Sequence, residues 1–253
     1  MNSFIFDLET NGLLDIVTTI HSLVLLNINN GTIISCADQE GYIPINDGIK
    51  ILNSADLLIG HNVIKYDIPV LEKLLPKTFK LKHTCLVFDT LVVSRLWAPE
   101  LDPFDYSRWA HIEPKYKGRH SLAAWGERLN TKKIAFTEES KKETDVEDVW
   151  EKWTVSMQKY CEQDTVVTHK LYDYFLAQKM DKRSLLLEHE FAKVISLQER
   201  FGFPFNSKAA YALVNDLKAK RSELEDSLQK TFPPISLERW SEKTGKQLKT
   251  KVT

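Results

Sequence analysis

The sequence has little cysteine, and its cysteines follow no disulfide or zinc-binding pattern. Cys36, Cys85 and Cys161 are the three cysteines among 253 residues, and they lie far apart with no Cys-x-x-Cys pair. An odd number of widely spaced thiols excludes a disulfide framework and a cysteine-based zinc site. We therefore expect free thiols in a reducing compartment.

Long apolar runs and an excess of one charge are also missing. No apolar run approaches the roughly 20 residues that cross a membrane, and Asp7 and Glu9 interrupt the N-terminal segment where a signal peptide needs an unbroken apolar core. We therefore expect a soluble cytoplasmic protein without a membrane partner. Lys and Arg number 34 against 35 for Asp and Glu, which excludes a wholly basic nucleic-acid-binding surface but allows a local basic stripe.

Two carboxylates interrupt the short apolar segment 4–10 at alternate positions. Residues i and i+2 of a strand point to the same face, so Asp7 and Glu9 would project side by side. Two buried like charges this close need a compensating cation or a shared proton. The pair therefore indicates a site for a hard divalent cation such as Mg²⁺ or Mn²⁺. The alternative is an edge strand whose acidic side chains face water.

The next polar side chains stand where predicted strands pass into helices. Residues 20–28 and 32–35 predict two strands after the first one, and a further strand ends just before Asn62. Asp67 stands at the start of the following helix, where an acid stabilises the helix N-terminus but can also project into a site at the sheet edge. Asn62 can reach the same place. Asp89, at the next strand-to-helix transition, is expected to be a cap or a structural acid.

Residues 97–117 show no periodicity, and prolines lie among their aromatic residues, so we expect a loop region. The basic segment 115–120 contains Tyr116 and can grip phosphates, although a solvated loop fits its composition equally well. A helix is expected to begin at Ser121. The charged stretch 137–148 is expected to be a mobile connection.

Helical spacing of apolar residues returns between Trp150 and Lys179 and predicts one or two helices. Tyr160 and Asp164 are four residues apart there, so they share one helix face. Taken alone, such a pair is more often ordinary packing than chemistry.

The order of these signals carries more information than any one of them. An Asp-x-Glu strand, an Asp at a strand-to-helix corner and a Tyr-x3-Asp helix follow one another, and in this order they resemble the three motifs of the DEDD nuclease superfamily in its tyrosine subtype. Further segments resemble the N-terminal 3′–5′ proofreading exonuclease domain of phage-type family A DNA polymerases and the residues just after it: 60–69, 89–96, 120–129 and 198–206. The resemblance extends over nearly the whole chain.

The resemblance implies an α/β fold of the ribonuclease-H-like type, with a mixed central sheet flanked by helices and a C-terminal helical extension. It also implies a metal-binding role for each matching acid. Asp7 would bridge two divalent ions, Mg²⁺ or alternatively Mn²⁺. Glu9 and Asp164 would complete the coordination of one ion, and Asp67 would hold the other, partly through water.

Further roles follow from the same resemblance. Tyr160, with Glu9, would orient the attacking water, while Thr10 and Leu13 match positions that contact the terminal nucleotide. Asn62 would lie near the scissile phosphate. Hydrolysis would use two metal ions, on the 3′ end of single-stranded DNA or on a frayed primer terminus, because a frayed end costs less energy to unpair.

We expect the exonuclease domain in residues 1–183 and, in 184–253, a helical extension that resembles the start of a polymerase thumb. Gly202 interrupts its apolar-periodic helices, and Asn206 caps the second one. An apolar stripe of this kind is usually core, or here an interface with something absent. The lysine-rich tail 241–253 is expected to be mobile.

No palm or fingers segment follows, so we expect that the chain cannot polymerise DNA unaided. Its expected partner is the polymerase palm and fingers, as the rest of the same protein or as a separate subunit, in the host cytoplasm if the chain is phage-encoded. An RNA-trimming DEDD nuclease is an alternative, because the metal site alone does not choose the sugar. A non-catalytic DNA-binding accessory domain is another alternative, against which the presence of all four acids argues.

Overall fold

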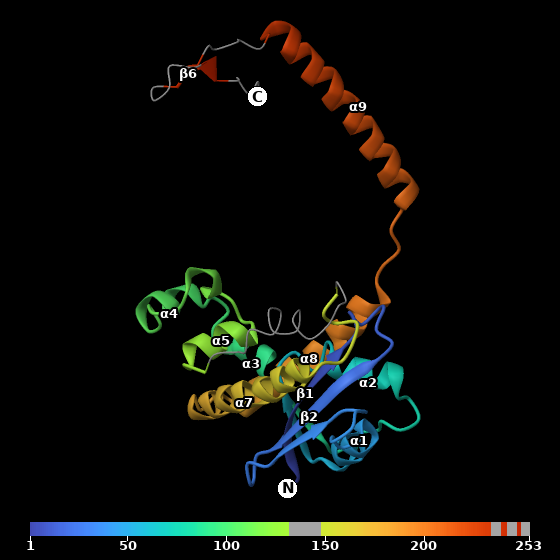
Figure 1. Cartoon of the computed structure of the whole chain (residues 1–253), viewed down its shortest axis with the longest axis vertical. Coiled ribbons are helices and arrows are strands. Elements are labelled where there is room, and N and C mark those ends of the chain that lie inside the picture. Colours follow the sequence, from blue (N-terminus) through green and yellow to red (C-terminus); the bar gives the residue numbers. More distant parts are fainter. Residues whose placement is uncertain (132–147, 234–238, 242–246, 249–253) are drawn as a thin grey trace. The chain divides into compact units, whose positions relative to one another are not determined.

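The computed structural model describes residues 1–131, 148–233, 239–241 and 247–248 (Figure 1). The chain divides into two compact units, Met1–Phe201 and Gly202–Thr253. The boundary expected after residue 183, between an exonuclease domain and its helical extension, stays a prediction. The expected mobile stretches 137–148 and 241–253 lie largely outside the described residues.

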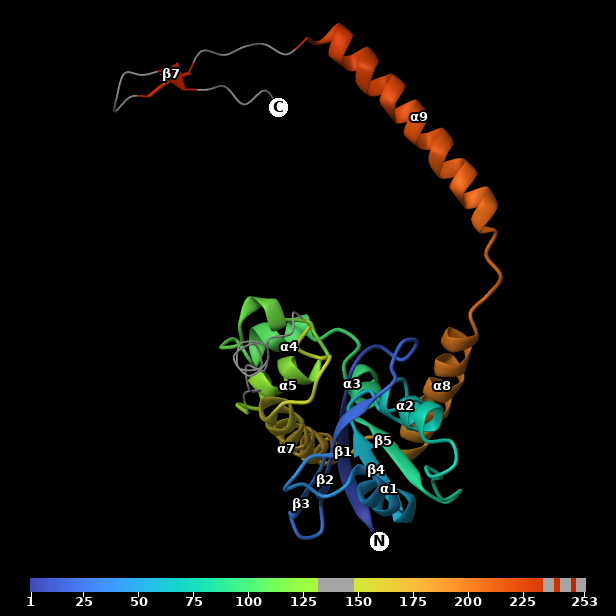
Figure 2. The same cartoon turned by 45° about the vertical axis from the view of Figure 1, so that its right-hand side comes forward.

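A five-stranded mixed sheet forms the centre of the first unit, in the order β3-β2-β1-β4-β5 (Figure 2). The strands are β1 (Ser3–Thr10), β2 (Ile20–Asn27), β3 (Ile33–Cys36), β4 (Leu57–Gly60) and β5 (Leu86–Asp89). The first three pair antiparallel, which confirms the predicted opening strands, whereas β4 is parallel to β1 and β5 is parallel to β4. Parallel strands end at the same edge of a sheet, so the ends of β1, β4 and β5 meet.

Helices account for most of the remaining described residues of this unit. They are α1 (Ile45–Ser54), α2 (Asp67–Leu74), α3 (Thr90–Trp97), α4 (Asp102–Ser107), the 3-10 turn η1 (Pro114–Tyr116), α5 (Leu122–Arg128), α7 (Val155–Ala177) and α8 (Lys182–Phe201). The helices expected at Asp67, Thr90 and Ser121 are confirmed, and the segment 150–179 contains the single long helix α7.

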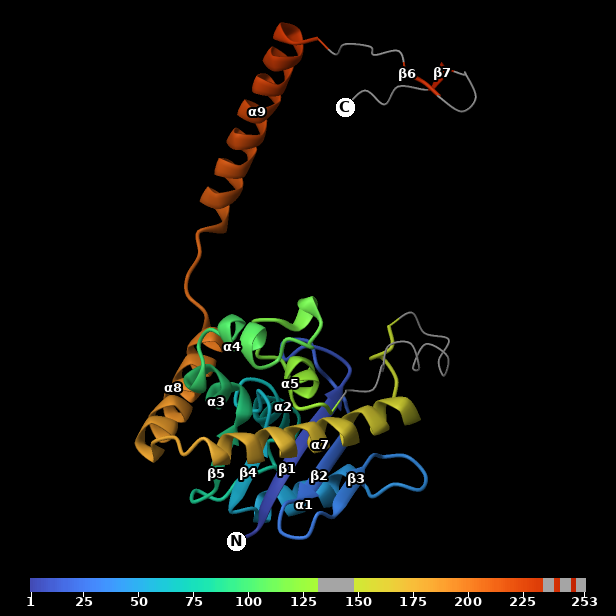
Figure 3. The ribbon, with the colours of Figure 1, turned by 90° about the vertical axis from the view of Figure 1, so that its left-hand side faces the viewer.

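The two faces of β1 pack against different helices. Its even-numbered apolar residues enter a core with α1 and α2: Phe4, Phe6 and Leu8. Ile5 packs on the opposite face, in a cluster with Tyr172 of α7, and Figure 3 shows α7 running across the sheet. Because side chains alternate along a strand, Asp7 and Glu9 share the α7 face with Ile5. A second core joins α3, α5 and α7 around the fully buried Trp125.

The prediction of a loop for 97–117 was wrong in part, since α4 and η1 lie within it. Proline is tolerated in the first turn of a helix, where its missing N–H costs nothing, and a proline stands in the first turn of each of these two elements. Periodicity could not reveal α4, because the helix spans only Asp102–Ser107 and is held by the buried Asp105.

The second unit contains α9 (Ser207–Thr231), capped by Asn206 as predicted, and the short strands β6 (Arg239–Trp240) and β7 (Gln247–Leu248). No residue of α9 is buried. Its apolar stripe stands in the solvent, each side chain more than half exposed: Leu213, Leu217, Leu224 and Leu228. Among the described helices, none is both long enough and apolar enough to cross a bilayer.

Asp89 is the structural acid that the sequence predicts. Its buried carboxylate accepts hydrogen bonds from the N–H groups of Leu91, Asn62 and Ile64 at 2.9, 2.9 and 3.0 Å. The first bond caps α3, and the other two fix the turn between β4 and α2. Burial raises the pKa of Asp89, and these three backbone donors act in the opposite direction. One side chain thus joins two strand-to-helix corners.

Asp89→Ala is expected to lower the free energy of unfolding by about 2–4 kcal/mol, because it removes a helix cap and leaves buried N–H groups without an acceptor. Urea denaturation followed by circular dichroism measures the change. Asp47→Ala is the matched control, since the Asp47 carboxylate is half exposed and pairs with Lys50 on the same helix; there we expect less than about 0.5 kcal/mol. Equal effects of the two substitutions would contradict the assigned role of Asp89.

Candidate active site

Asp7 and Glu9 lie side by side on β1, as the strand periodicity predicts. Each offers a carboxylate oxygen within 4.8 Å of the other's and of the Cys161 sulfur. Glu9 is 7% exposed, and Asp7 is half-buried. The alternative of two solvated edge-strand acids is wrong, because β1 is the central strand of the sheet and α7 covers this face.

Asp67 begins α2 and turns its carboxylate towards β1. Its Oδ1 accepts the N–H of Leu8 at 3.2 Å, between the two acids of the strand. The residue is 4% exposed. Burial raises the pKa of Asp67 to about 7, and the negative charges of Asp89 and Asp164 push the pKa in the same direction. The helix-start position and the site position, which the sequence left as alternatives, are therefore compatible.

Helix α7 brings Asp164 and Cys161 to the same strand. The Cys161 thiol donates a hydrogen bond to the carbonyl oxygen of Asp7 at 3.4 Å, and Asp164, one helical turn further on, is 5% exposed. Burial raises the pKa of the Cys161 thiol well above its usual range, as do the charges of Asp7, Glu9 and Asp164. Cys161 is therefore a neutral donor that joins α7 to β1.

Two hollows flank the acids. A cleft of about 670 Å³ is lined by Asp7, His61, Asn62, Leu91, Arg95, Arg119, His120, Ser121, Leu122, Ala123 and Asp164. A pocket of about 410 Å³ adjoins Glu9 and is lined by Leu8, Glu9, Thr10, Asn11, Gly12, Leu13, Ile16, Tyr66, Asp148 and Trp150. The cleft carries basic side chains opposite the acids, whereas the pocket is mostly apolar. This division suits a chain of phosphates in one hollow and a base or sugar in the other.

Thr10 and Leu13 both lie in the pocket. The Thr10 and Tyr66 hydroxyls lie within hydrogen-bond distance of each other and of the carbonyl oxygen of Gly12, which is 2.6 Å from the Tyr66 hydroxyl and 3.1 Å from the Thr10 hydroxyl. Their two protons satisfy two of these three contacts at a time. These bonds tie the turn after β1 to the start of α2. Leu13 remains 75% exposed at the pocket rim, where an apolar side chain is available to a ligand.

Asn62 lines the cleft from the turn that follows β4. Its backbone is left-handed, with φ at 70°, a conformation that asparagine tolerates better than most residues. The N–H of Asn62 is held by the Asp89 carboxylate. Helix α8 also contacts this turn. The Ser196 hydroxyl donates to the carbonyl oxygen of Ile64 at 3.3 Å, and the Glu199 carboxylate pairs with the Lys65 ammonium group at 2.7 Å.

Tyr160 lies on the same helix as Asp164, and its ring stands edge-on to Trp150, with the centroids 6.4 Å apart. Trp150 in turn lines the pocket beside Glu9. Tyr160 is therefore on the pocket side of the acids, and its role in orienting water stays a prediction.

Sequence reasoning singled out the basic segment 115–120, two of whose side chains, Arg119 and His120, line the cleft, but it missed two other residues of the cleft and one histidine outside it. Arg95 and His61 carried no motif of their own; only their place in strand-to-helix segments could have suggested them. His189 of α8 accepts the N–H of Asp89 at its Nε2, 2.8 Å away, and donates from Nδ1 to the carbonyl of Leu185. This bond joins α8 to the end of β5, and no sequence pattern signals it.

The donor set fits hard divalent cations. Asp7 and Glu9 each offer a carboxylate oxygen within 4.8 Å of the other's, Asp164 lines the same cleft as Asp7, and the Asp67 carboxylate bonds the backbone of β1. Mg²⁺ and Mn²⁺ prefer such oxygen ligands. Burial raises the pKa of Asp67, and a nearby positive charge would offset that desolvation. Asp7, Glu9, Asp67 and Asp164 are the residues that would hold the ions.

Similar proteins include two phage enzymes. The chain is 31% identical to the DNA-directed DNA polymerase of Enterobacteria phage T3 over a 265-residue alignment, which covers 89% of this chain and 36% of that protein. It is 32% identical to the DNA-directed DNA polymerase of Escherichia phage T7, with the same two coverages. The chain thus spans about a third of the length of these relatives. No protein-family model matches the chain.

Solved structures share the fold at lower identity. A nuclease in its apo form superposes with a TM-score of 0.51 and 19% identity, over 79% of this chain and 86% of that one. Brucella melitensis NrnC bound to pGG gives a TM-score of 0.51 and 16% identity, over 80% and 86%. With the mixed five-stranded sheet and its flanking helices, the expected ribonuclease-H-like fold with a helical extension is confirmed.

Asp67→Asn is expected to stabilise the metal-free chain. Asparagine keeps an oxygen for the Leu8 N–H and removes a buried negative charge, so the melting temperature in EDTA at pH 7.5 should rise by about 2–4 °C. Because the folded-state pKa of Asp67 is raised, ionisation costs stability from about pH 4 upward and in full above about 7. The gain should therefore shrink as the pH falls from 7 to 4. Differential scanning calorimetry measures both effects.

The matched control is Asp173→Asn on the exposed side of α7, where the carboxylate is 62% exposed. We expect no gain there at any pH. Magnesium should raise the melting temperature of the parent chain and of the control, but much less that of Asp67→Asn. A drop in the melting temperature of Asp67→Asn in EDTA would show that the crowding of charges is not the dominant effect.

Proposed function

Since the chain is homologous over most of its length to the DNA polymerases of phages T3 and T7, we propose that it is a magnesium-dependent 3′–5′ DNA exonuclease that proofreads for such a polymerase. The observation that carries the proposal is the close pair Asp7 and Glu9 at the end of β1, with Asp67 bonded to the backbone between them and Asp164 in the cleft that Asp7 lines. The pair lies between a cleft with basic side chains and a mostly apolar pocket. The fold shared with nucleases supports the same conclusion.

The chain's own residues divide the work. The four acids Asp7, Glu9, Asp67 and Asp164 hold the metal site. With divalent ions bound, the site would supply an activated water and stabilise the charge that develops on the phosphate and on the leaving 3′ oxygen. Tyr160 and Glu9 orient the water.

Substrate binding uses the two hollows. The terminal nucleotide occupies the pocket, against Thr10 and Leu13. The cleft receives the remaining strand, with Asn62 near the scissile phosphate and Arg119 close to a backbone phosphate further from the 3′ end. Both hollows adjoin the acids, so one strand passing from cleft to pocket brings its last phosphodiester to the metal site. Such a path requires an unpaired end, which is how mispaired primer termini are selected.

The second unit supports a polymerase context. Leu213, Leu217 and Leu228 of α9 are each more than half exposed, and exposed apolar stripes of this kind mark interaction surfaces. The chain also spans only about a third of its relatives' length. We propose that this stripe packs against the polymerase palm and fingers, in the same protein or in a separate subunit.

The double substitution Asp7→Ala with Glu9→Ala is expected to abolish hydrolysis, by at least about a thousandfold, because it removes the acids that β1 supplies to the site. The assay is digestion of a 5′-labelled single-stranded DNA oligonucleotide with magnesium, with EDTA, and beside RNA of the same sequence. The parent chain should give a magnesium-dependent ladder that shortens from the 3′ end, faster on DNA than on RNA.

The control for charge alone is Glu40→Ala with Asp47→Ala, which removes two negative charges at partly or fully exposed positions away from the acids. This variant should keep the parent's rate. Full activity in the double variant of β1 would refute the assignment of the site, and a faster digestion of RNA would favour an RNA-trimming nuclease. Circular dichroism checks that both variants fold.

A further inference from the structure

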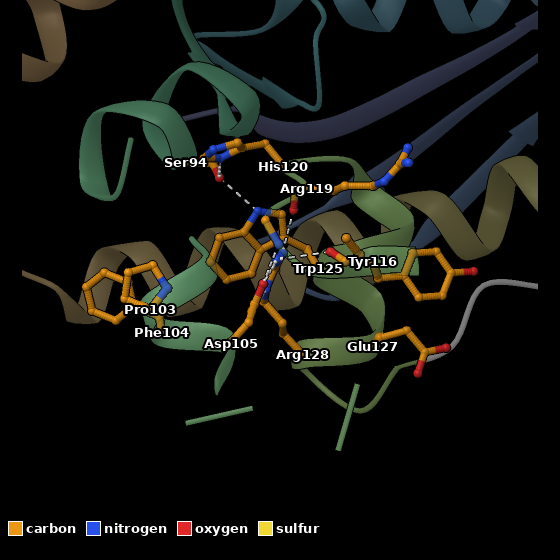
Figure 4. Close-up of polar contacts among 12 residues, drawn as sticks. Ser94, Pro103, Phe104, Asp105, Tyr116, Arg119, His120, Trp125, Glu127 and Arg128 are labelled. Atoms are coloured by element: carbon orange, nitrogen blue, oxygen red, sulfur yellow. Dashed lines mark hydrogen bonds and ion pairs between the residues drawn. The ribbon is translucent and has the colours of Figure 1, made fainter. Parts of the chain in front are cut away.

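A pair of oppositely charged side chains, Arg128 and Asp105, is completely buried in the first unit. Arg128, at the end of α5, donates from Nε to Asp105 Oδ1 at 2.7 Å and from Nη2 to Asp105 Oδ2 at 2.8 Å. Its guanidinium lies 4.9 Å from the ring centre of Trp125. Figure 4 shows this pair at the centre of a set of polar contacts. It is a two-pronged bond between the short helix α4 and the end of α5.

The pair also holds the backbone of the basic segment between them. Arg128 Nη1 donates to the carbonyl of Arg119 at 2.7 Å, and Nη2 lies 3.4 Å from the carbonyl of Tyr116. On the other side, Asp105 Oδ2 accepts the N–H of Gly118 at 2.8 Å. Gly118 has a φ of +70°, and a Cβ on it would lie 2.8 Å from the Asp102 carboxylate. The course of residues 116–119 is therefore set by one buried ion pair.

The last residue of this segment and the residue after it contribute side chains to the cleft. Arg119 and His120 both line the cleft that contains Asp7 and Asp164. His120 is fixed separately, because its Nδ1 lies 2.7 Å from the Ser94 hydroxyl, which in turn accepts the indole N–H of Trp125 at 2.8 Å. Arg119, by contrast, has an exposed side chain and is anchored through its own carbonyl. Its position depends on Arg128.

Stability alone is a weak reason for such a pair. Desolvation of two buried charges roughly cancels their attraction, so an ion pair of this kind adds little net stability over apolar side chains of the same size. The fork of arginine does something that apolar side chains and lysine cannot, since it bonds a carboxylate and two carbonyls at fixed angles at once. The pair therefore matters chiefly because it fixes the position of the backbone around it.

We propose that the Arg128–Asp105 pair is a positioning device that aims Arg119 at a backbone phosphate of the single strand, away from the scissile bond. The inference rests on the proposed exonuclease function. Arg128 touches no substrate and acts through the segment 116–119. It follows that the pair controls how tightly a strand of several nucleotides binds and leaves the chemical step alone.

Arg128→Lys keeps the charge but loses the fork. With a single-stranded hexanucleotide, we expect KM to rise about tenfold with kcat within twofold of the parent value, the pattern of a lost ground-state contact. With a dinucleotide, which has no phosphate beyond the scissile one, kcat/KM should stay within twofold. A merely destabilised protein would lose activity on both substrates in the same proportion. Arg183→Lys, at a side chain 92% exposed, is the matched control.

A second variant guards against misfolding of the first. Gly118→Ala leaves the buried pair intact but forces an unfavourable φ and a contact with Asp102, so it should shift the segment and reproduce the rise in KM. Arg119→Gln should give the same rise, and combining it with Arg128→Lys should add less than twofold, because both remove one contact. Fully multiplicative effects would overturn the proposal, as would an equal loss on the dinucleotide.

Binding separates this proposal from the proposed function. Fluorescence anisotropy of a labelled hexanucleotide in EDTA should give a Kd about tenfold weaker for Arg128→Lys than for the parent. If the parent binds but hydrolyses neither substrate with magnesium, the exonuclease function fails while the positioning role is still read from Kd. An unchanged Kd in both Arg128→Lys and Gly118→Ala would refute the positioning role even if hydrolysis is normal.

Discussion

Crowding of like charges at the end of β1 is the constraint on which the rest of the first unit depends. Asp7 and Glu9 share one face of a central strand, and Asp67 and Asp164 lie near them on helices that pack on opposite faces of the sheet. Negative charges on these side chains repel one another, so the surrounding contacts must hold the strand and the two helices together against that repulsion. The contacts that do so are neutral donors: the N–H of Leu8 towards Asp67 and the thiol that joins α7 to β1.

The molecule contains two kinds of buried acid, and they are handled in opposite ways. Asp89 and Asp105 are satisfied within the chain, the first by three backbone N–H groups and the second by Arg128 and a backbone N–H. Asp67 has one backbone donor from β1 and a pKa raised to about 7. The satisfied acids shape the turns around the cleft, and the crowded ones are the proposed metal ligands. This contrast, more than burial as such, separates scaffold from candidate chemistry.

Local patterns predicted the parts of the site that lie on regular elements. The period of two placed Asp7 beside Glu9, the start of α2 placed Asp67, and helical spacing put Asp164 on the face of Tyr160. What joins distant segments had no such signature. The bond from His189 to Asp89 spans one hundred residues, and α4 is too short to show a period. A pairing such as Asp105 with Arg128 appears only when the fold brings two charges together, because either residue alone looks like part of a solvated surface.

Cys161 turns the contact between α7 and β1 into an observable. Its sulfur is completely buried against the carbonyl of Asp7, and a thiol reagent reaches it only when the helix separates from the strand. Cys85 is half-buried and Cys36 is buried beneath α1, far along the sheet. The order in which the thiols become labelled therefore separates the loss of the contact between α7 and β1 from general unfolding. Labelling of Cys161 thus reports when α7 separates from β1.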